Sequence, residues 1–210
     1  MGELKVMKMI FFDTETTGLK PGSICQLSYI FVDTDVKPTL TIGKNIFFAV
    51  EYIEPSAEAV HGFSVEALYE LSKGQYFEDR LEEFLEDFQT ADIFIGHNIK
   101  FDLKFLAYEL EGCGEIFTPK NTFCTMNYYK DICKLPSNRS DYKMPKLQEA
   151  ASFLHVKDGD IDILSKKYFA ESGDFHDARF DTTATYMLVT EGIKKGLIPR
   201  NYFSSIVKRS

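Results

Sequence analysis

Asp13 and Glu15 stand two residues apart, where a short apolar run gives way to a polar cluster. Side chains two apart in a strand point to the same side, so the two carboxylates face one space. Neighbouring carboxylates repel each other unless a positive charge lies between them, and oxygen-rich pairs suit Mg²⁺ or Mn²⁺. The pair therefore predicts a divalent-metal site, although solvated acidic residues in a turn after a strand give the same pattern.

Three further residues carry groups that could complete such a site. Asp102 opens a predicted helix after another apolar run, and Asp181 lies in the first turn of a later helix, five residues after His176. Asp102 could also serve only the positive end of its helix dipole, and His176 could be a surface loop residue. With an unperturbed pKa of about 6.5, however, an imidazole can accept a proton at neutral pH.

The three segments together are far more specific than any one residue. They read Asp13-Thr14-Glu15-Thr16-Thr17-Gly18, then Gly96-His97-Asn98-Ile99-Lys100-Phe101-Asp102, then His176-Asp177-Ala178-Arg179-Phe180-Asp181. They resemble the three exonuclease motifs of the DnaQ-like family, in its subclass with a histidine in the third motif, which includes the proofreading epsilon subunit of bacterial DNA polymerase III. Val60-His61-Gly62-Phe63-Ser64 also resembles a stretch of epsilon-type members, so the likeness runs from Met9 to about Leu188.

The resemblance implies an α/β, ribonuclease-H-like fold with a central mixed five-stranded sheet flanked by helices. It implies that two Mg²⁺ or Mn²⁺ ions are bound by Asp13, Glu15, Asp102 and Asp181, and that His176 is the general base. Two such ions, about 3.5–4 Å apart, can clamp a scissile phosphate. The implied reaction is hydrolysis of single-stranded DNA from its 3′ end to nucleoside 5′-monophosphates, in proofreading or repair.

Residues beside the motifs are candidates for binding the terminal nucleotide. They are Thr16, Thr17, His61, His97, Asn98 and Phe101. By the resemblance, the threonine turn holds the nucleotide, and the Phe101 ring can stack on a base. Packing remains an alternative role for each, because buried polar residues often only satisfy their neighbours. Lys143, Lys146 and Arg139 are candidates for phosphate contacts or for a merely solvated loop.

Other functions share parts of this pattern. An RNA exonuclease similar to ribonuclease T or oligoribonuclease would use the same fold, metals and histidine, and would differ in contacts to the 2′-hydroxyl. A non-catalytic module that binds nucleic-acid ends would be expected to lose one of the five motif residues, and all five are present. A phosphatase is disfavoured because the aspartyl-nucleophile signature with its lysine is not evident. Gln26 stands where many relatives carry a glutamate, which bears on substrate preference.

The pattern of apolar residues predicts the elements that position these groups. Strands are expected at residues 9–12, 24–32, 45–53 and 92–96, where β-branched and aromatic residues gather. Helices are expected at residues 77–88, 100–111, 146–154 and 177–195. Residues 119–145 are expected to be irregular. Three successive strands followed by alternating strands and helices predict an antiparallel start to a mixed sheet with helices on its faces.

Length and composition favour one domain. The 210 residues, 44% of them hydrophobic, suggest a single exonuclease domain over 1–210, with a core of about 7–195 and a short C-terminal tail. The net charge of −8 argues against a protein that coats long nucleic acid, permits contact with one strand end, and suits a site that receives cations. The four scattered cysteines indicate neither a zinc site nor a disulfide framework.

Location and partners follow from what the sequence lacks. We expect a cytoplasmic protein without a membrane association, because no apolar run approaches the length of a signal peptide or a membrane span. The expected partner is the 3′ end of single-stranded DNA or RNA. A polymerase partner is not established, because a long flexible tail of the kind that epsilon uses to hold its polymerase is not evident.

Overall fold

The protein, described by a computed structural model over residues 7–138 and 141–207, is built on one five-stranded sheet. Its strands are β1 (Lys8–Thr16), β2 (Ile24–Asp33), β3 (Leu40–Phe47), β4 (Ile93–Gly96) and β5 (Thr122–Cys124). Their spatial order is β3-β2-β1-β4-β5. The first three strands are antiparallel, whereas β4 and β5 run parallel to β1. The predicted mixed sheet with an antiparallel start is confirmed.

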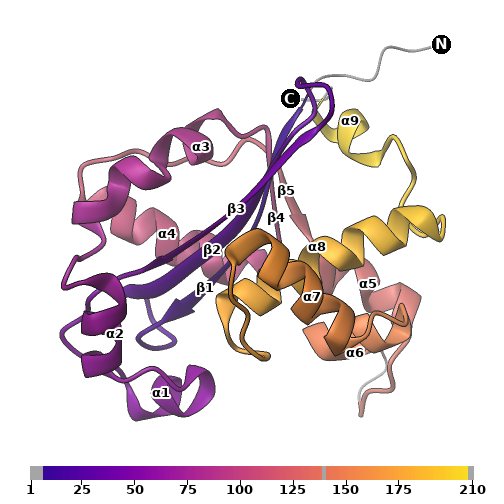
Figure 1. The fold of residues 1–210 in the computed structure, drawn as a ribbon. Helices are drawn as coiled ribbons and strands as arrows, with labels where there is room; N and C mark the ends of the chain where they lie inside the picture. Colours follow the sequence, from indigo (N-terminus) through magenta and orange to yellow (C-terminus); the bar gives the residue numbers. More distant parts are fainter. Residues whose placement is uncertain (1–6, 139–140, 208–210) are drawn as a thin grey trace.

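Helices cover both faces of the sheet (Figure 1), with α3 and α4 on one side and α5 to α8 on the other. Their bounds are α1 Pro55–His61, α2 Val65–Ser72, a 3₁₀ helix Glu78–Glu83, α3 Leu85–Thr90, α4 Ile99–Gly112, α5 Thr125–Cys133, α6 Leu147–Phe153, α7 Asp158–Phe169, α8 Ala178–Lys194 and α9 Tyr202–Val207. Over the described ranges, no helix combines the length and apolar character needed to cross a bilayer.

The central strand β1 contributes to a separate core on each face. Ile10 and Phe12 pack into the cluster under α3 and α4, whereas Phe11 packs against α8 beside Leu188. Side chains alternate along a strand, so odd-numbered residues of β1 face α8 and even-numbered ones face α4. The carboxylate of Asp13 is thereby directed toward the α8 side.

The third strand differs from its prediction at both ends. Residues 45–53 were expected as a strand, but β3 runs from Leu40 to Phe47. The apolar residues Val50 and Ile53 beyond it pack against Leu68 of α2 and Cys25 of β2. Their burial under a helix produces the same apolar pattern as strand pairing, which explains the error.

Two other predicted segments also differ. The helix expected over residues 77–88 is broken at Phe84, whose φ of −137° separates the 3₁₀ helix from α3. The break lets Phe84 pack edge-on against both Phe77 and Phe88, with ring centroids 5.4 and 5.7 Å apart. Residues 119–145 are not irregular throughout, since they contain β5 and α5.

Four helices outside these segments were not predicted. They are α1, α2, α7 and α9. In the segment expected as a C-terminal tail, Phe203 and Val207 of α9 are buried and belong to the core cluster on the α8 face. This part of the chain therefore contributes to the domain core.

Two glycines offer a matched test of the packing of α7 on the sheet. A Cβ at Gly43 of β3 would lie 2.7 Å from both Cβ and the carbonyl oxygen of Tyr168. Gly43→Ala should therefore lower the free energy of unfolding by about 1–3 kcal/mol. Gly159→Ala, in α7 with nothing within 4 Å of the new Cβ, should raise it by about 0.5–1 kcal/mol. Urea unfolding of both variants measures this, and equal effects would contradict the packing.

Candidate active site

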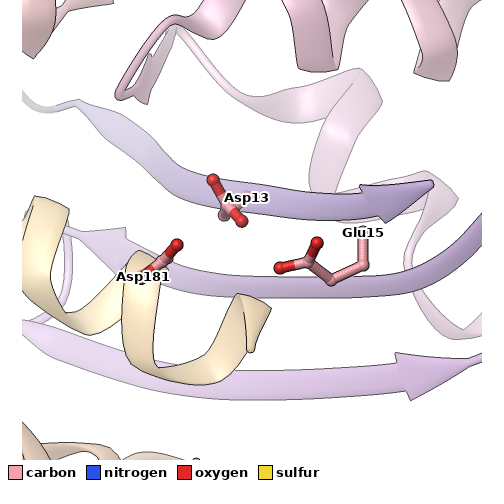
Figure 2. A group of neighbouring side chains, drawn as sticks. All are labelled: Asp13, Glu15 and Asp181. Atoms are coloured by element: carbon pink, nitrogen blue, oxygen red, sulfur yellow. The ribbon is translucent and has the colours of Figure 1, made fainter. Parts of the chain in front are cut away.

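Three of the predicted acidic residues meet where β1 passes the first turn of α8. Asp13, Glu15 and Asp181 each offer a carboxylate oxygen, and these three atoms lie within 4.8 Å of one another. Figure 2 shows the side chains of these residues turned toward one space between the strand and the helix. Asp13 and Glu15 share this side because they are two apart in β1, as the sequence predicts.

Asp102 approaches from the other face of the sheet. It lies in the first turn of α4, 3% exposed, and its Oδ1 accepts hydrogen bonds from the amide and hydroxyl of Thr14 at 3.1 and 2.9 Å. It is not part of the group of three. Its charge is still close enough to be the largest of the carboxylate contributions that raise the pKa of Asp13.

Burial and mutual repulsion make this cluster costly to ionise. Burial is the largest cause of the raised pKa of Asp13 and of Glu15, and the neighbouring carboxylates add to it. Burial also raises the pKa of Asp102 and that of Asp181 to about 7 each. Oδ1 of Asp181 is buried and has no hydrogen-bond partner among the described residues. Crowded carboxylates with an unpartnered oxygen fit a site for divalent cations.

His176 lies at the edge of this cluster. Its backbone N–H donates to Oδ2 of Asp181 at 3.3 Å, and its φ of 74° is in the left-handed region. Such a conformation is uncommon for a residue other than glycine. The exposed side chain lines a cavity of about 490 Å³ together with Asp13 and Asp181. The predicted base thus shares a solvent-accessible space with two of the predicted metal ligands.

A second cavity, of about 340 Å³, opens on the other side of the carboxylates. It is lined by Thr14, Glu15, Thr16, Gly18, Leu19, Ser56, Ala57, Val60, His61 and Phe101. Three of the predicted nucleotide-binding residues, Thr16, His61 and Phe101, are therefore brought together. Thr17 is not: its hydroxyl donates to the carbonyl of Ser23 within the turn that follows β1.

The two ring nitrogens of His61 have different surroundings. Nδ1 accepts a hydrogen bond from the backbone N–H of Phe63 at 3.0 Å. Burial lowers the pKa of His61, and in the neutral imidazole the proton must then be on Nε2. Nε2 is buried and forms no hydrogen bond of good geometry within the described part of the chain, although an interaction with the backbone of Thr16 opposes the effect of burial on the pKa. His61 is thus a neutral, partly buried ring in the wall of the 340 Å³ cavity.

His97 and Asn98 line the 490 Å³ cavity instead. Both ring nitrogens of His97 have protein partners at 3.0 Å, the hydroxyl of Thr125 and the carbonyl of Pro145. Burial lowers the pKa of His97 to about 4, so the ring is neutral and links two segments. This favours packing for His97 over direct nucleotide contact. Asn98 is exposed at the start of α4.

The basic residues proposed for phosphate contact have varied surroundings. Lys146 lines the 490 Å³ cavity. Lys143 pairs with Glu149, with Nζ and Oε1 2.5 Å apart. Arg139 lies outside the described residues. Among the described residues of this set, Lys146 is therefore the one that shares a cavity with Asp13 and Asp181.

Some residues of the site were missed by the sequence reasoning. Leu19 is 79% exposed and Val60 54% exposed, and both line the 340 Å³ cavity. The sequence could have indicated them, since each is an apolar residue that stands beside a motif and among polar residues. Asp177 caps α8 and is held by Gln26 and Arg179. Its location in the third motif was visible, but its partners were not.

Comparison with known proteins identifies the family of this chain. The sequence model of a family described as exonuclease, RNase_T, matches residues 10–188. The chain belongs to this DnaQ-like exonuclease family. Membership makes it a nuclease of the hydrolase class.

Curated relatives of this exonuclease-family chain include epsilon subunits of DNA polymerase III. The subunit from Salmonella typhimurium is 24% identical over 180 residues, which cover 80% of this chain and 72% of the relative. The subunit from Rickettsia felis is 36% identical over 110 residues, or 50% of this chain and 44% of the relative. The epsilon-like character suggested by the sequence is confirmed.

Solved structures of exonuclease I share the fold. The Escherichia coli enzyme in complex with a dA16 oligonucleotide matches with a TM-score of 0.69 and 15% identity, over 97% of this chain and 44% of that one. The enzyme from Methylocaldum szegediense matches with a TM-score of 0.68 and 16% identity, over 95% and 42%. The ribonuclease-H-like fold is confirmed, and the chain spans less than half the length of exonuclease I.

The raised pKa values predict an unusual pH dependence for the metal-free protein. When the folded-state pKa of a carboxyl exceeds its unfolded value of about 4, folding is favoured at low pH and loses stability as pH rises toward the folded value. The folded pKa is about 7 for Asp102 and Asp181. Thermal unfolding in chelator should therefore show a higher Tm near pH 5.5 than near pH 8, by several degrees.

Two controls isolate the cluster as the cause. Adding Mn²⁺ at pH 8 should recover most of the lost stability, because cations remove the repulsion. Asp181→Asn should shrink the pH difference in chelator. A wild-type protein equally stable at both pH values would contradict the ionisation cost of the cluster.

Proposed function

We propose that the chain is a metal-dependent 3′-to-5′ exonuclease that releases nucleoside 5′-monophosphates from single-stranded DNA. The observation that carries the proposal is the carboxylate cluster of Asp13, Glu15 and Asp181, which lies between two cavities. Hydrolysis of a phosphodiester needs charge stabilisation at the phosphate, a base for water and a place for the terminal nucleotide. Residues suited to each task surround this cluster.

The metal ligands would be Asp13, Glu15, Asp181 and Asp102, holding two Mg²⁺ or Mn²⁺ ions. The close carboxylate oxygens and the unpartnered Oδ1 of Asp181 support this role. Bound divalent ions supply positive charge at a scissile phosphate. The side chain of Asp102 would need to turn its carboxylate from Thr14 toward the other three, or to share it with them.

His176 would take the proton of the attacking water on a ring nitrogen. Its exposed imidazole can meet a water in the 490 Å³ cavity that it shares with Asp13 and Asp181. The bond from its backbone N–H to Asp181 ties the base to a proposed metal ligand. Base and cations would therefore act on the same side of the phosphate.

The 340 Å³ cavity would hold the terminal nucleotide, and its volume is at the lower end of the range of small-molecule sites. Its walls combine exposed apolar side chains, Leu19 and Val60, with the ring of Phe101. A nucleobase could stack on that ring. The ring of His61 would border the nucleotide on the same cavity wall.

The choice of nucleic acid as partner is supported by relatives. Exonuclease I of Escherichia coli has been crystallised with oligonucleotides such as dA13 and dA16, and the curated relatives are polymerase subunits. For this chain, a single-stranded DNA end is the proposed substrate. No feature of the described residues identifies a polymerase partner.

A gel assay of single-stranded DNA tests the function. With Mg²⁺ or Mn²⁺, a 5′-labelled strand should yield a ladder that shortens from the 3′ end. Chelator should stop the reaction, and so should Asp13→Ala, because it removes a proposed metal ligand. A matched 5′-labelled RNA degraded faster would move the substrate to RNA. If the protein bound the DNA strand and the RNA strand tightly but shortened neither, this result would contradict hydrolysis and indicate a binding module.

The role of His176 has its own matched pair of variants. His176 and His155 are both exposed and both have positive φ, 74° and 57°, a conformation that asparagine tolerates. His176→Asn should lower kcat by roughly 10²–10⁴-fold through loss of the base. Calorimetric Mn²⁺ binding should persist. His155→Asn should retain full activity, and an equal loss in both variants would refute the assignment.

A further inference from the structure

Gln26 is a buried side chain beside the carboxylate cluster that the proposed reaction does not use. It lies in β2 directly opposite Glu15 in the antiparallel pair with β1, and it is 0% exposed. Paired residues of neighbouring strands project to the same face. The amide of Gln26 therefore points to the α8 side, as the carboxylate of Glu15 does.

Three hydrogen bonds fix the orientation of this amide. Nε2 donates to Oδ1 of Asn45 at 2.9 Å and to Oδ1 of Asp177 at 3.1 Å. Oε1 accepts from the backbone N–H of Ala178 at 3.1 Å. A glutamine has one accepting and one donating end, and here each end meets its complement. The side chain thus joins the sheet to the beginning of α8.

Asp177 connects the amide of Gln26 to the first turn of α8. Its carboxylate caps α8 by accepting from the N–H of Arg179 at 3.0 Å, and it pairs with the Arg179 guanidinium, whose Nη2 lies 2.7 Å from Oδ2. Arg179 in turn lies over the ring of Phe47, 5.6 Å from its centroid. Through its ion pair, Arg179 compensates the charge of Asp177, which is a further carboxylate close to Asp13 and Glu15.

The residues on either side of Asp177 are the proposed base and the helix that bears a metal ligand. His176 precedes it, and the backbone N–H of Asp181 donates to the Asp177 carbonyl at 3.0 Å. A displacement of Asp177 would therefore move both His176 and Asp181 relative to β1. Thr182 adds a second attachment through its hydroxyl bond to the carbonyl of Ser28, at 3.0 Å.

We propose that Gln26 is a positioning residue, whose amide holds Asp177 and Ala178 so that Asp181 and His176 face Asp13 and Glu15. The role rests on the proposed function, because it concerns the ligands and base of that reaction. The terminal-nucleotide cavity lies apart from this contact: neither Gln26 nor Asp177 lines it. Loss of the amide should thus affect metal binding and turnover and spare substrate binding.

The test compares Gln26→Met with the wild-type protein. Methionine keeps the length of the side chain and removes both ends of the amide. Calorimetric Mn²⁺ affinity and kcat should fall by about 10- to 100-fold, as is usual when the support of a metal ligand is lost. KM for a 5′-labelled single strand should stay unchanged. Unchanged Mn²⁺ affinity and kcat in a folded variant would overturn the proposal.

Tyr29→Phe is the matched control. Tyr29 lies on the same strand, is equally buried, and donates to Oδ2 of Asp87 at 2.7 Å on the opposite face. This variant should lose thermal stability without losing Mn²⁺ affinity. If both variants lose Mn²⁺ affinity equally, the effect is general destabilisation and the positioning role is refuted.

A second variant and a separate reading of the wild-type result allow the experiment to test the role of Gln26 in every case. Should Gln26→Met fail to fold, Gln26→Asn retains an amide that is one methylene too short to span Ala178 and Asp177, and the same losses are expected. If the wild-type protein binds Mn²⁺ but degrades no strand, the proposed function fails, while the calorimetric comparison still decides the role of Gln26.

Discussion

Electrostatic repulsion within the carboxylate cluster is the constraint on which the rest of the structure depends. Asp13, Glu15 and Asp181 are held with oxygens within 4.8 Å of one another, and burial raises the pKa of each. An unconstrained chain would separate such groups or protonate them. The fold must therefore supply stability elsewhere to keep them together.

That stability comes from the two cores that enclose β1. One cluster contains Ile10 and Phe12 on the α4 side, and the other contains Phe11 on the α8 side. Apolar burial stabilises by about 25 cal/mol per Å², and here apolar surface is buried on both faces of β1. Thr14 and Gln26 then add directional contacts, which hold Asp102 and the start of α8 in place.

The sequence predicted which acidic side chains lie close together better than it predicted the bounds of the elements around them. Local spacing settles that Asp13 and Glu15 share a side of β1, and the motif order placed Asp181 in an early helical turn. The end of β3 at Phe47 and the break at Phe84 were missed, because apolar residues look alike whether they pack under a helix or pair in a strand. The contact of Gln26 with Asp177 joins residues 151 apart, and no local pattern encodes such a pair.

Because side chains alternate between the two faces of β1, the strand tolerates few changes in its length. Asp13 and Glu15 project to one face and Thr14 to the other, so inserting or deleting a single residue of the strand before Asp13 would exchange the faces of all three. The carboxylates would then be buried among the aromatic rings below α4. Length variation among descendants of this gene should accordingly occur in turns away from the site, such as residues 34–39, while the strand itself admits only substitution.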